Sequence, residues 1–332
     1  MTSRALVLSG GGPVGIAWES GLLGGFAKAG LDLSKADFIM GTSAGSFVGA
    51  RLAMGVTPEE LAAPFLAMDD SKPAALPAAS SDKPEDPASP PNTALLFRRM
   101  ERAQASGKSP EEIRADIGAF ALETQTIDED AYIRSFGRWM SELPLDAWPE
   151  RAYGCTAVDA LTGAFHLWTK ESGVGLARAV ASSCSVPGIY PPITINGRRY
   201  IDGGMRSGSN ADQAKGYDRM IVIAIRAGAD GPLGDRAKRA LDVEIKVLTD
   251  VGAQVEVVYP DTASITAFGA NMMDARQRPP AAKAGYAQGQ ADAKGACGFL
   301  ERLGRSWRFA KPWRAMKIRE YRSSSMFCSH GG

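Results

Sequence analysis

The amino-acid sequence predicts an α/β fold in which helices cover a mainly parallel central sheet. Two observations lead to this prediction. Short apolar runs alternate with segments whose apolar residues recur at helical spacing, and glycine-rich turns join the first strands to the helices that follow them. The composition agrees, because 45% hydrophobic and 23% charged residues are ordinary for a globular chain and exclude a wholly disordered or collagenous one. A length of 332 residues suits one large domain or two modest ones.

The N-terminal region contains two strand–turn–helix units. Ala5–Leu8 is a short apolar run typical of a buried parallel strand, and Gly15–Ala29 carries apolar residues at helical spacing up to a stop at Gly30. Phe38–Met40 is the second predicted strand, and Ser43–Met54 is the second predicted helix. Strands and helices that alternate in this way predict parallel pairing of the strands.

The segment 69–92 interrupts this alternation. It contains six prolines among alanine, serine and acidic residues, and it carries too little apolar surface to join a core, so we predict a mobile loop there. The following segment, 95–140, has a helical pattern and is predicted to form a helical cap inserted into the domain. Within it, Ser109 before Pro110 is a typical helix start, with serine as the N-cap and proline at the first helical position.

The sheet is predicted to resume after this insertion. Asn196-Gly197 is a strong signal for a two-residue hairpin turn between two strands. The remaining predicted elements are, in order, strands at Tyr153–Val158 and Ala164–Thr169, a helix at Val174–Ser182, strands at Pro191–Thr194, Arg198–Ile201 and Met220–Ile225, a helix at Arg236–Val251, a strand at Gln254–Tyr259 and a closing helix at Ala281–Leu303.

The pentapeptide Gly41-Thr42-Ser43-Ala44-Gly45 is the first candidate for chemistry. It lies between a predicted strand and a predicted helix, where flanking glycines allow a turn sharp enough to hold the serine hydroxyl clear of the backbone. The following helix directs the positive end of its dipole to the same point, which favours developing negative charge. Serine between glycines also occurs as a plain helix N-cap, so it is the strand–turn–helix context that favours a nucleophile at Ser43.

The glycine-rich segment Gly10–Gly15 is the second candidate. Consecutive glycines between a strand and a helix present several backbone N–H groups to an anion, either a phosphate or the oxyanion of an acyl-transfer intermediate. Gly10, Gly12 and Gly15 also satisfy the dinucleotide-binding pattern Gly-x-Gly-x-x-Gly. That pattern calls for an acidic residue at the end of the second strand, where this chain has Met40, so nucleotide binding is the less favoured alternative.

An activated serine needs a base, and the chain holds only two histidines. His166 lies within a predicted hairpin strand and His330 lies next to the C-terminus, so a serine–histidine–acid triad is poorly supplied. Asp202 follows a predicted hairpin strand and precedes Gly203-Gly204. An aspartate before glycine is more often a turn residue, and spacing alone leaves a turn role and a catalytic role open.

Together these motifs resemble the patatin-like phospholipase family. The resemblance rests on the glycine loop Gly10–Gly15, the turn Gly41–Gly45 and the sequence Asp202-Gly203-Gly204. It is reinforced by Ala181–Pro192, which is similar to the proline-bearing block that precedes the aspartate in that family. The four motifs occur in the family's order and span about residues 4–260, leaving out the proline-rich loop and the helical cap.

The resemblance implies a three-layer α/β/α patatin-like fold and a serine–aspartate dyad that acts without histidine, metal or cofactor. Ser43 is implied as the nucleophile and Asp202 as the base that takes its proton directly. The substrate is implied to be an acyl ester of a phospholipid or neutral lipid, cleaved through an acyl-serine by phospholipase A, lysophospholipase or esterase activity. The other implied site residues are the oxyanion-hole glycines Gly10, Gly11 and Gly12 and the elbow glycines Gly41 and Gly45.

Two departures and two alternatives accompany the resemblance. Val14 stands where the family often has arginine, and Asn210-Ala211 stands where it often has asparagine followed by proline. An acyltransferase would use the same acyl-serine but pass the acyl group to an alcohol. A catalytically silent lipid-binding protein could keep the fold, although Ser43 and Asp202 are both present and disfavour that alternative.

Charge and cysteine content limit which binding partners and which cellular compartment are expected. Lysine plus arginine number 38 against 37 aspartate plus glutamate, and this balance argues against a dedicated nucleic-acid binder. The four cysteines form no Cys-x-x-Cys pair, so we expect neither a disulfide framework nor a zinc site but reduced thiols in the cytoplasm. No apolar run reaches the roughly 18 residues of a spanning helix, and the N-terminus does not resemble a secretory signal.

The segment 305–322 is the most basic part of the chain. It holds seven basic side chains against one acidic one, interleaved with Trp307, Phe309, Trp313 and Tyr321. Basic and aromatic residues of this kind suit peripheral contact with an anionic membrane surface. The alternative is a tail packed on its own domain. We therefore divide the chain into a single hydrolase domain at 1–304 and a basic aromatic tail at 305–332, and the sequence does not indicate an oligomeric state.

Overall fold

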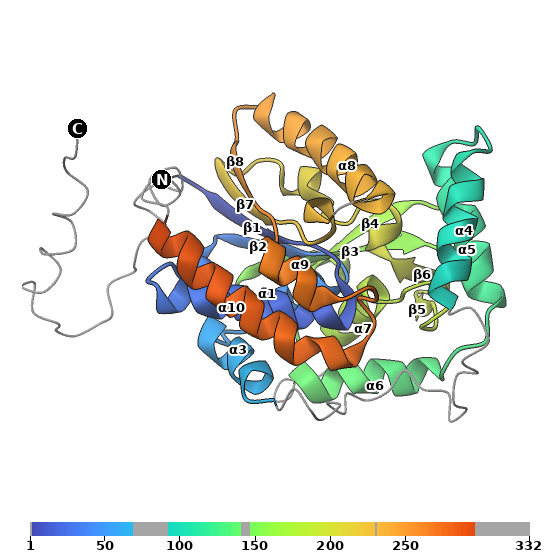
Figure 1. Ribbon diagram of the computed structural model, residues 1–332. Helices are drawn as coiled ribbons and strands as arrows, with labels where there is room; N and C mark the ends of the chain where they lie inside the picture. The colour runs from blue at the N-terminus through green and yellow to red at the C-terminus, as the bar shows by residue number, and fades with distance from the viewer. Residues whose placement is uncertain (1, 69–91, 141–146, 230, 296–332) are drawn as a thin grey trace, which may run out of the picture.

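The computed structural model describes residues 2–68, 92–140, 147–229 and 231–295. The predicted loop at 69–92 lies outside these residues except for its last position, and so do the end of the predicted closing helix and the tail at 305–332. The described residues form an α/β/α arrangement, with one sheet between two layers of helices (Figure 1).

The sheet is parallel through its centre. Strands β1 (Arg4–Leu8), β2 (Phe38–Gly41), β3 (Ala152–Asp159), β7 (Arg219–Ile223) and β8 (Gln254–Val258) all run in one direction. They lie in the hydrogen-bonding order β3-β2-β1-β7-β8. Parallel strands bring their carboxyl ends to the same edge, which is where ligands bind in open α/β sheets.

Three strands that pair antiparallel with their neighbours extend the sheet beyond β3. These are β4 (Phe165–Thr169), β5 (Ile193–Ile195) and β6 (Arg198–Asp202). β4 and β6 each pair with β3, and β5 pairs with β6 through the predicted hairpin at Asn196-Gly197. The prediction of a mainly parallel sheet is therefore confirmed.

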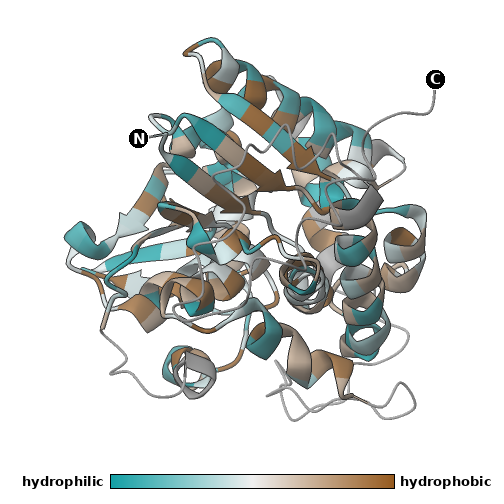
Figure 2. Ribbon diagram, turned by 90° about the vertical axis from the view of Figure 1, so that its left-hand side faces the viewer, coloured by the Kyte–Doolittle hydropathy of each residue, from teal (hydrophilic) through white to brown (hydrophobic). Residues whose placement is uncertain are grey.

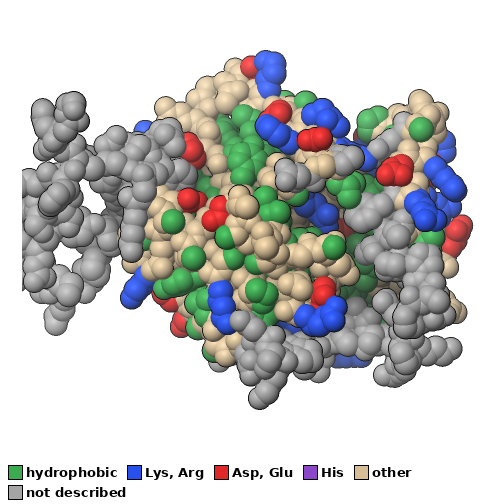
Figure 3. Space-filling view, viewed as in Figure 1, with side chains coloured by type: hydrophobic (Ala, Val, Ile, Leu, Met, Phe, Trp, Pro, Cys, Tyr) green, Lys and Arg blue, Asp and Glu red, His purple; other side chains and the backbone are tan. Residues whose placement is uncertain are grey.

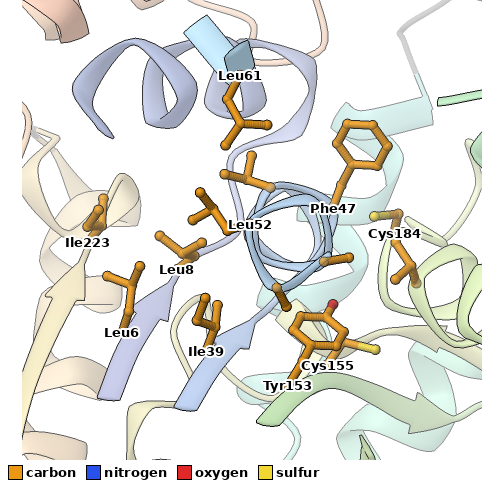
Figure 4. Close-up of a cluster of buried hydrophobic side chains, with 14 of the residues drawn as sticks. Leu6, Leu8, Ile39, Phe47, Leu52, Leu61, Tyr153, Cys155, Cys184 and Ile223 are labelled. Carbon is orange, nitrogen blue, oxygen red and sulfur yellow. The ribbon is translucent and has the colours of Figure 1, made fainter. Parts of the chain in front are cut away.

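Alternation along the strands separates two apolar layers. Leu6 and Leu8 of β1 face the helices α1 (Gly12–Lys28) and α2 (Ala44–Ala53), and Figure 4 shows their side chains beside those of Leu52 and Leu61. Ala5 and Val7 face the opposite side and pack in a cluster with Leu241 and Leu248 of helix α8 (Pro232–Thr249). The strands in the middle of the molecule are largely hydrophobic, whereas the surface helices mix hydrophobic and hydrophilic residues (Figure 2). This confirms the three-layer prediction.

Helix α10 (Arg278–Gly295) crosses α1 at very close range. A Cβ atom at Gly21 of α1 would overlap the carbonyl of Ala282, and one at Gly289 of α10 would overlap the carbonyl of Leu22. Only glycine at these positions allows the two backbones to approach so closely. The contact adds a second row of helices on the α1 side of the sheet (Figure 1).

The predicted helical cap consists of three helices. Ser109 is the N-cap of the middle one and Pro110 its first residue, as the sequence predicts, and Ser109 also forms a reciprocal capping box with Glu112. Two further helices, α3 (Pro58–Leu66) and α9 (Thr262–Phe268), are absent from the sequence prediction. The remaining helices are α4 (Asn92–Gln104), α5 (Pro110–Glu123), α6 (Glu129–Met140) and α7 (Leu176–Ser183). Among the described residues, no helix has the length and apolar character needed to cross a membrane.

Candidate active site

Ser43 lies at a strained turn between β2 and α2. Its backbone has φ 52° and ψ −119°, in the half of conformational space that non-glycine residues rarely adopt. The flanking glycines are needed for close approach: a Cβ at Gly41 would overlap the backbone of Gly45, and a Cβ at Gly45 would overlap the Leu8 carbonyl. The pentapeptide therefore forms the sharp strand-to-helix turn that the sequence predicts, with Ser43 at the N-cap of α2.

The end of helix α7 holds this turn in place. The backbone N–H of Ser43 donates to Ser183 Oγ at 3.0 Å, and Cys184 Sγ donates to the Ser43 carbonyl at 3.1 Å. Ser46 Oγ donates to the same carbonyl at 2.6 Å. The sequence alone indicates no role for Ser183 or Cys184, although both belong to the proline-bearing block Ala181–Pro192. All three bonds involve the backbone of Ser43. They therefore fix the strained turn without using the Ser43 hydroxyl.

Strand pairing brings Ser43 and Asp202 together. On one edge of β3, Gly41 at the end of β2 pairs with Cys155, and Asp202 at the end of β6 pairs with Ala157. β4 pairs with both Cys155 and Ala157, so it occupies the other edge. β2 and β6 therefore run toward each other along the same edge of β3, and their ends meet near Thr156. The nucleophile candidate follows one end and the base candidate occupies the other.

Asp202 is a buried carboxylate with one oxygen available. Its side chain is 2% exposed, and Oδ1 accepts a hydrogen bond from the Gly204 N–H at 2.7 Å. Oδ2 is buried and accepts no hydrogen bond of normal geometry from the described residues. Burial raises the Asp202 pKa from 3.8 to about 6, although the Ser43 hydroxyl, the Gly204 N–H and the Arg226 guanidinium each lower it in part. The Ser43 hydroxyl is thus close enough to Asp202 to favour its charged form, as a group that passes its proton to Asp202 must be.

The glycine loop offers two of its three predicted amides. The Gly10 N–H donates to the Gly208 carbonyl at 2.8 Å and is therefore occupied. The N–H groups of Gly11 and Gly12 donate to no group in the described part of the chain, and Gly12 opens helix α1 with φ 59°. Free amides at a helix N-terminus attract negative charge. A Cβ built on Gly10 would lie 3.3 Å from Ser43 Cβ, so this loop adjoins the serine.

Asn210 connects the serine turn to the aspartate turn. Its Nδ2 donates to Thr42 Oγ1 at 3.1 Å and to the Gly203 carbonyl at 3.2 Å. These partners are the neighbours of Ser43 and of Asp202 along the chain. Asn210 is fully buried and itself adopts a left-handed backbone with φ 50°. It therefore fixes the two turns relative to each other.

The residue after Asn210 shows why this chain departs from the asparagine–proline pattern. The Ala211 N–H donates to Glu244 Oε2 at 2.8 Å, and Ser209 Oγ donates to the same oxygen at 2.7 Å. Proline has no N–H and could not make the first of these bonds. Burial raises the pKa of Glu244, and these two donors oppose that rise together with Ser207. Alanine at position 211 thus keeps the backbone N–H that donates to the buried Glu244 carboxylate on α8.

His166 lies away from the candidate site. It is on β4, opposite Ala157 and therefore on the far edge of β3 from Asp202, at two strand spacings or about 10 Å. Its ring stacks on Trp168 at 5.3 Å and contacts Tyr200 edge-on, and burial lowers its pKa. His330 lies outside the described residues. Within the described ranges, no group of three or more histidine, cysteine, aspartate or glutamate side chains could hold a metal ion.

The fold and these residues define an α/β protein with a serine elbow beside a glycine loop. The family model of the patatin-like phospholipases matches residues 6–215, and the chain belongs to this family. The match covers the glycine loop, the elbow and Asp202. Membership of this family supports lipid acyl hydrolase activity for this chain.

Comparison with solved structures gives more distant similarities. VipD from Legionella pneumophila is 13% identical with a TM-score of 0.42, over 92% of this chain and 70% of that one. The type III effector ExoU is 15% identical with a TM-score of 0.36, over 92% of this chain and 54% of that one. Full-length ExoU from Pseudomonas aeruginosa, in complex with SpcU, is 15% identical with a TM-score of 0.30, over 85% of this chain and 51% of that one. The chain thus spans about half the length of ExoU. A search of curated proteins gives no match.

Proposed function

We propose that this chain is a serine hydrolase of lipid acyl esters that uses Ser43 and Asp202 as a dyad. The observation that carries the proposal is the pairing of the strained serine turn with a buried carboxylate whose Oδ2 has no regular hydrogen-bond partner in the described ranges. The glycine loop beside them supplies free backbone N–H groups, and the family assignment supports a lipid ester as the substrate. Each of the three parts of the site has one chemical task.

In the first step, Ser43 Oγ attacks the carbonyl carbon of the ester while Asp202 Oδ2 accepts the serine proton. The carbonyl π-bond opens, and the resulting oxyanion is stabilised by the N–H groups of Gly11 and Gly12 at the start of α1. Removing one good donor of this kind costs about 2.7–4 kcal/mol in acyl transfer. Carboxylate is a weaker base than imidazole, so oxyanion stabilisation carries a large share of the rate.

In the second step, the oxyanion collapses and the bond to the alkoxy oxygen breaks. The leaving alcohol takes the proton from Asp202, and the acyl group stays on Ser43 as an ester. Water then attacks this ester, Asp202 accepts a proton from the water, and the same oxyanion site is used again. Collapse releases the carboxylic acid and returns the proton to Ser43 Oγ. An Asp202 pKa of about 6 keeps the carboxylate mostly ionised at neutral pH while making it a stronger base than an ordinary aspartate.

The proposal is tested by hydrolysis of a soluble short-chain ester. Ser43→Ala is expected to lose several orders of magnitude in kcat, because it removes the covalent nucleophile. Ser135→Ala is the matched control, since among the described residues the Ser135 hydroxyl bonds only to the Tyr132 carbonyl in its own helix. Equal turnover by folded Ser43→Ala and wild type would refute the proposal. Product analysis with an added alcohol separates release of free acid from acyl transfer.

We also propose that residues 1–304 form the hydrolase domain and that the basic segment 305–322 contacts an anionic membrane surface. The support is compositional, because seven basic side chains alternate there with aromatic ones. Truncation after Gly304 is expected to weaken binding to anionic vesicles while sparing hydrolysis of a soluble ester. Equal vesicle binding by the folded truncated chain would contradict the membrane proposal, and failure of that chain to fold would favour a packed tail.

A further inference from the structure

Arg226 stands at the catalytic end of the sheet, next to the glycine loop. It follows β7, which pairs with β1 in the register Ile223 opposite Leu8. The preceding residue, Ile225, leaves the strand and donates its N–H to Ser9 Oγ at 2.9 Å. Its side chain reaches the loop, since a Cβ at Gly11 would collide with Ile225 Cδ1. The chain is thus anchored against the glycine loop where Arg226 begins a 3₁₀ turn.

The Arg226 guanidinium is partly buried and forms no ion pair or side-chain hydrogen bond with any described residue. Two other arginines differ in this respect: Arg206 pairs with Asp212 at 2.6 Å and Arg198 pairs with Asp159. Burial lowers the pKa of Arg226, and Asp202 is the group whose charge opposes that effect. Arg226 is therefore close enough to Asp202 to interact electrostatically but too far for an ion pair.

A partly buried guanidinium that makes no ion pair or hydrogen bond has lost hydrating water, and no direct interaction replaces it. An anion that entered the site would restore charge-assisted hydrogen bonds to it, and the planar guanidinium fork matches a phosphate with two parallel bonds. The glycine loop itself supplies no charged side chain, because Gly10–Gly15 contains only glycine, proline and the buried Val14. On the face shown in Figure 3, basic side chains also lie over α8 and over the α4–α5 pair.

We propose that Arg226 binds a phosphate group of the substrate, and so selects acyl esters that carry a phosphate near the scissile bond over neutral esters. The inference rests on the proposed function, because it places the reacting ester between Ser43 and the glycine loop. An ester held there has its remaining substituents within the charged surroundings of Asp202 and Arg226. A phosphate gives the Arg226 guanidinium the ion-pair partner that no described residue supplies, whereas a neutral alcohol does not.

The test compares two soluble substrates that differ only in phosphate, 1-hexanoylglycerol 3-phosphate and 1-hexanoylglycerol. It is run at about pH 8, well above the Asp202 pKa of about 6, so the carboxylate is ionised in wild type. Among the groups that lower this pKa, Arg226 contributes least. Arg226→Gln is expected to lower kcat/KM for the phosphate ester about 10- to 100-fold, as expected for loss of a charge-assisted bond. The neutral ester is expected to change little, and Arg226→Lys is expected to recover part of the loss.

Arg239→Gln is the matched control, because Arg239 is an exposed residue of α8 and its loss removes the same charge from the surface. If Arg226→Gln keeps the preference for the phosphate ester, or loses the same factor on both substrates, the proposal is overturned. Failure of the proposed function is a separate result, in which wild type cleaves neither ester or Ser43→Ala cleaves both.

Competition identifies the source of the phosphate. Inhibition of neutral-ester cleavage by glycerol 3-phosphate, weaker in Arg226→Gln than in wild type, supports a lipid headgroup as the ligand. Equal inhibition by inorganic phosphate supports a site for phosphate itself. If both compounds inhibit Arg226→Gln as strongly as wild type, phosphate binds elsewhere and the assignment to Arg226 is wrong.

Discussion

Replacing the proposed base by its neutral isostere is expected to make the protein more stable while it destroys activity. Asp202 is nine-tenths or more buried, and burial raises its pKa from 3.8 to about 6. A carboxyl whose pKa is higher in the folded state binds its proton more tightly there, so the folded state loses stability as pH rises through this range. Asp202→Asn removes the charge and keeps an oxygen that can accept from the Gly204 N–H.

The size of the effect follows from the two pKa values. A shift from 3.8 to about 6, at 1.36 kcal/mol per unit, corresponds to about 3 kcal/mol of destabilisation once the group is fully ionised. Below pH 3.8 both folded and unfolded chains are protonated at this position, and the penalty vanishes. We therefore expect the free energy of unfolding of Asp202→Asn to exceed that of wild type by at most about 3 kcal/mol above pH 6, with the gap closing toward pH 4.

The assay is urea denaturation of both chains between about pH 4 and pH 8. Asp159→Asn is the matched control with the opposite sign, because Asp159 is also buried but hydrogen bonds from Arg198, Thr162 and Leu161 outweigh burial and lower its pKa. This control is expected to lose stability at neutral pH. The reasoning is refuted if Asp202→Asn is less stable than wild type at pH 7, or if the gap between them does not change with pH.

Three further predictions follow from the same structure. The kcat/KM for a neutral ester is expected to rise with pH through about 6, the Asp202 pKa, and a flat profile from pH 5 to 8 would count against Asp202 as base. Ala211→Pro is expected to cost about 1–3 kcal/mol in urea denaturation, because it deprives buried Glu244 of a donor, while Ala211→Gly keeps the N–H and costs less. Replacing both His166 and His330 by glutamine is expected to leave turnover measurable, and a folded but inactive double variant would favour a histidine triad.

The local units of the fold could be predicted from the sequence, but their long-range pairing could not. The runs Ala5–Leu8 and Phe38–Met40 and the glycines after them give β1, β2 and the elbow, because strand and turn signals act within a few residues. That β2 and β6 end on the same edge of β3 depends on pairings between distant residues, such as Ala157 with Asp202. No pattern of spacing contains that information, so spacing alone left the role of Asp202 open.

The missed elements have separate physical causes. Helix α3 carries a detectable signal, because Thr57 and Glu60 form a capping box around Pro58. The apolar run Met220–Ile225 predicts a strand that ends two residues later than β7, since periodicity cannot show that the Ile225 N–H bonds to a side chain and not to the sheet. The role of Arg226 depends on that early exit from the sheet, and the sequence gives no signal for it.

The central claim is that Ser43 is the nucleophile and Asp202 activates it, and covalent labelling tests this most directly. A fluorophosphonate probe reacts with activated serines, and peptide mass analysis identifies the residue that carries it. We predict one adduct, on the peptide containing Ser43, with no adduct in Ser43→Ala and a labelling rate in Asp202→Asn reduced by at least about 100-fold, as expected for loss of a catalytic base. Labelling of Ser43→Ala at the wild-type rate, or of Asp202→Asn at that rate while folded, would contradict the dyad.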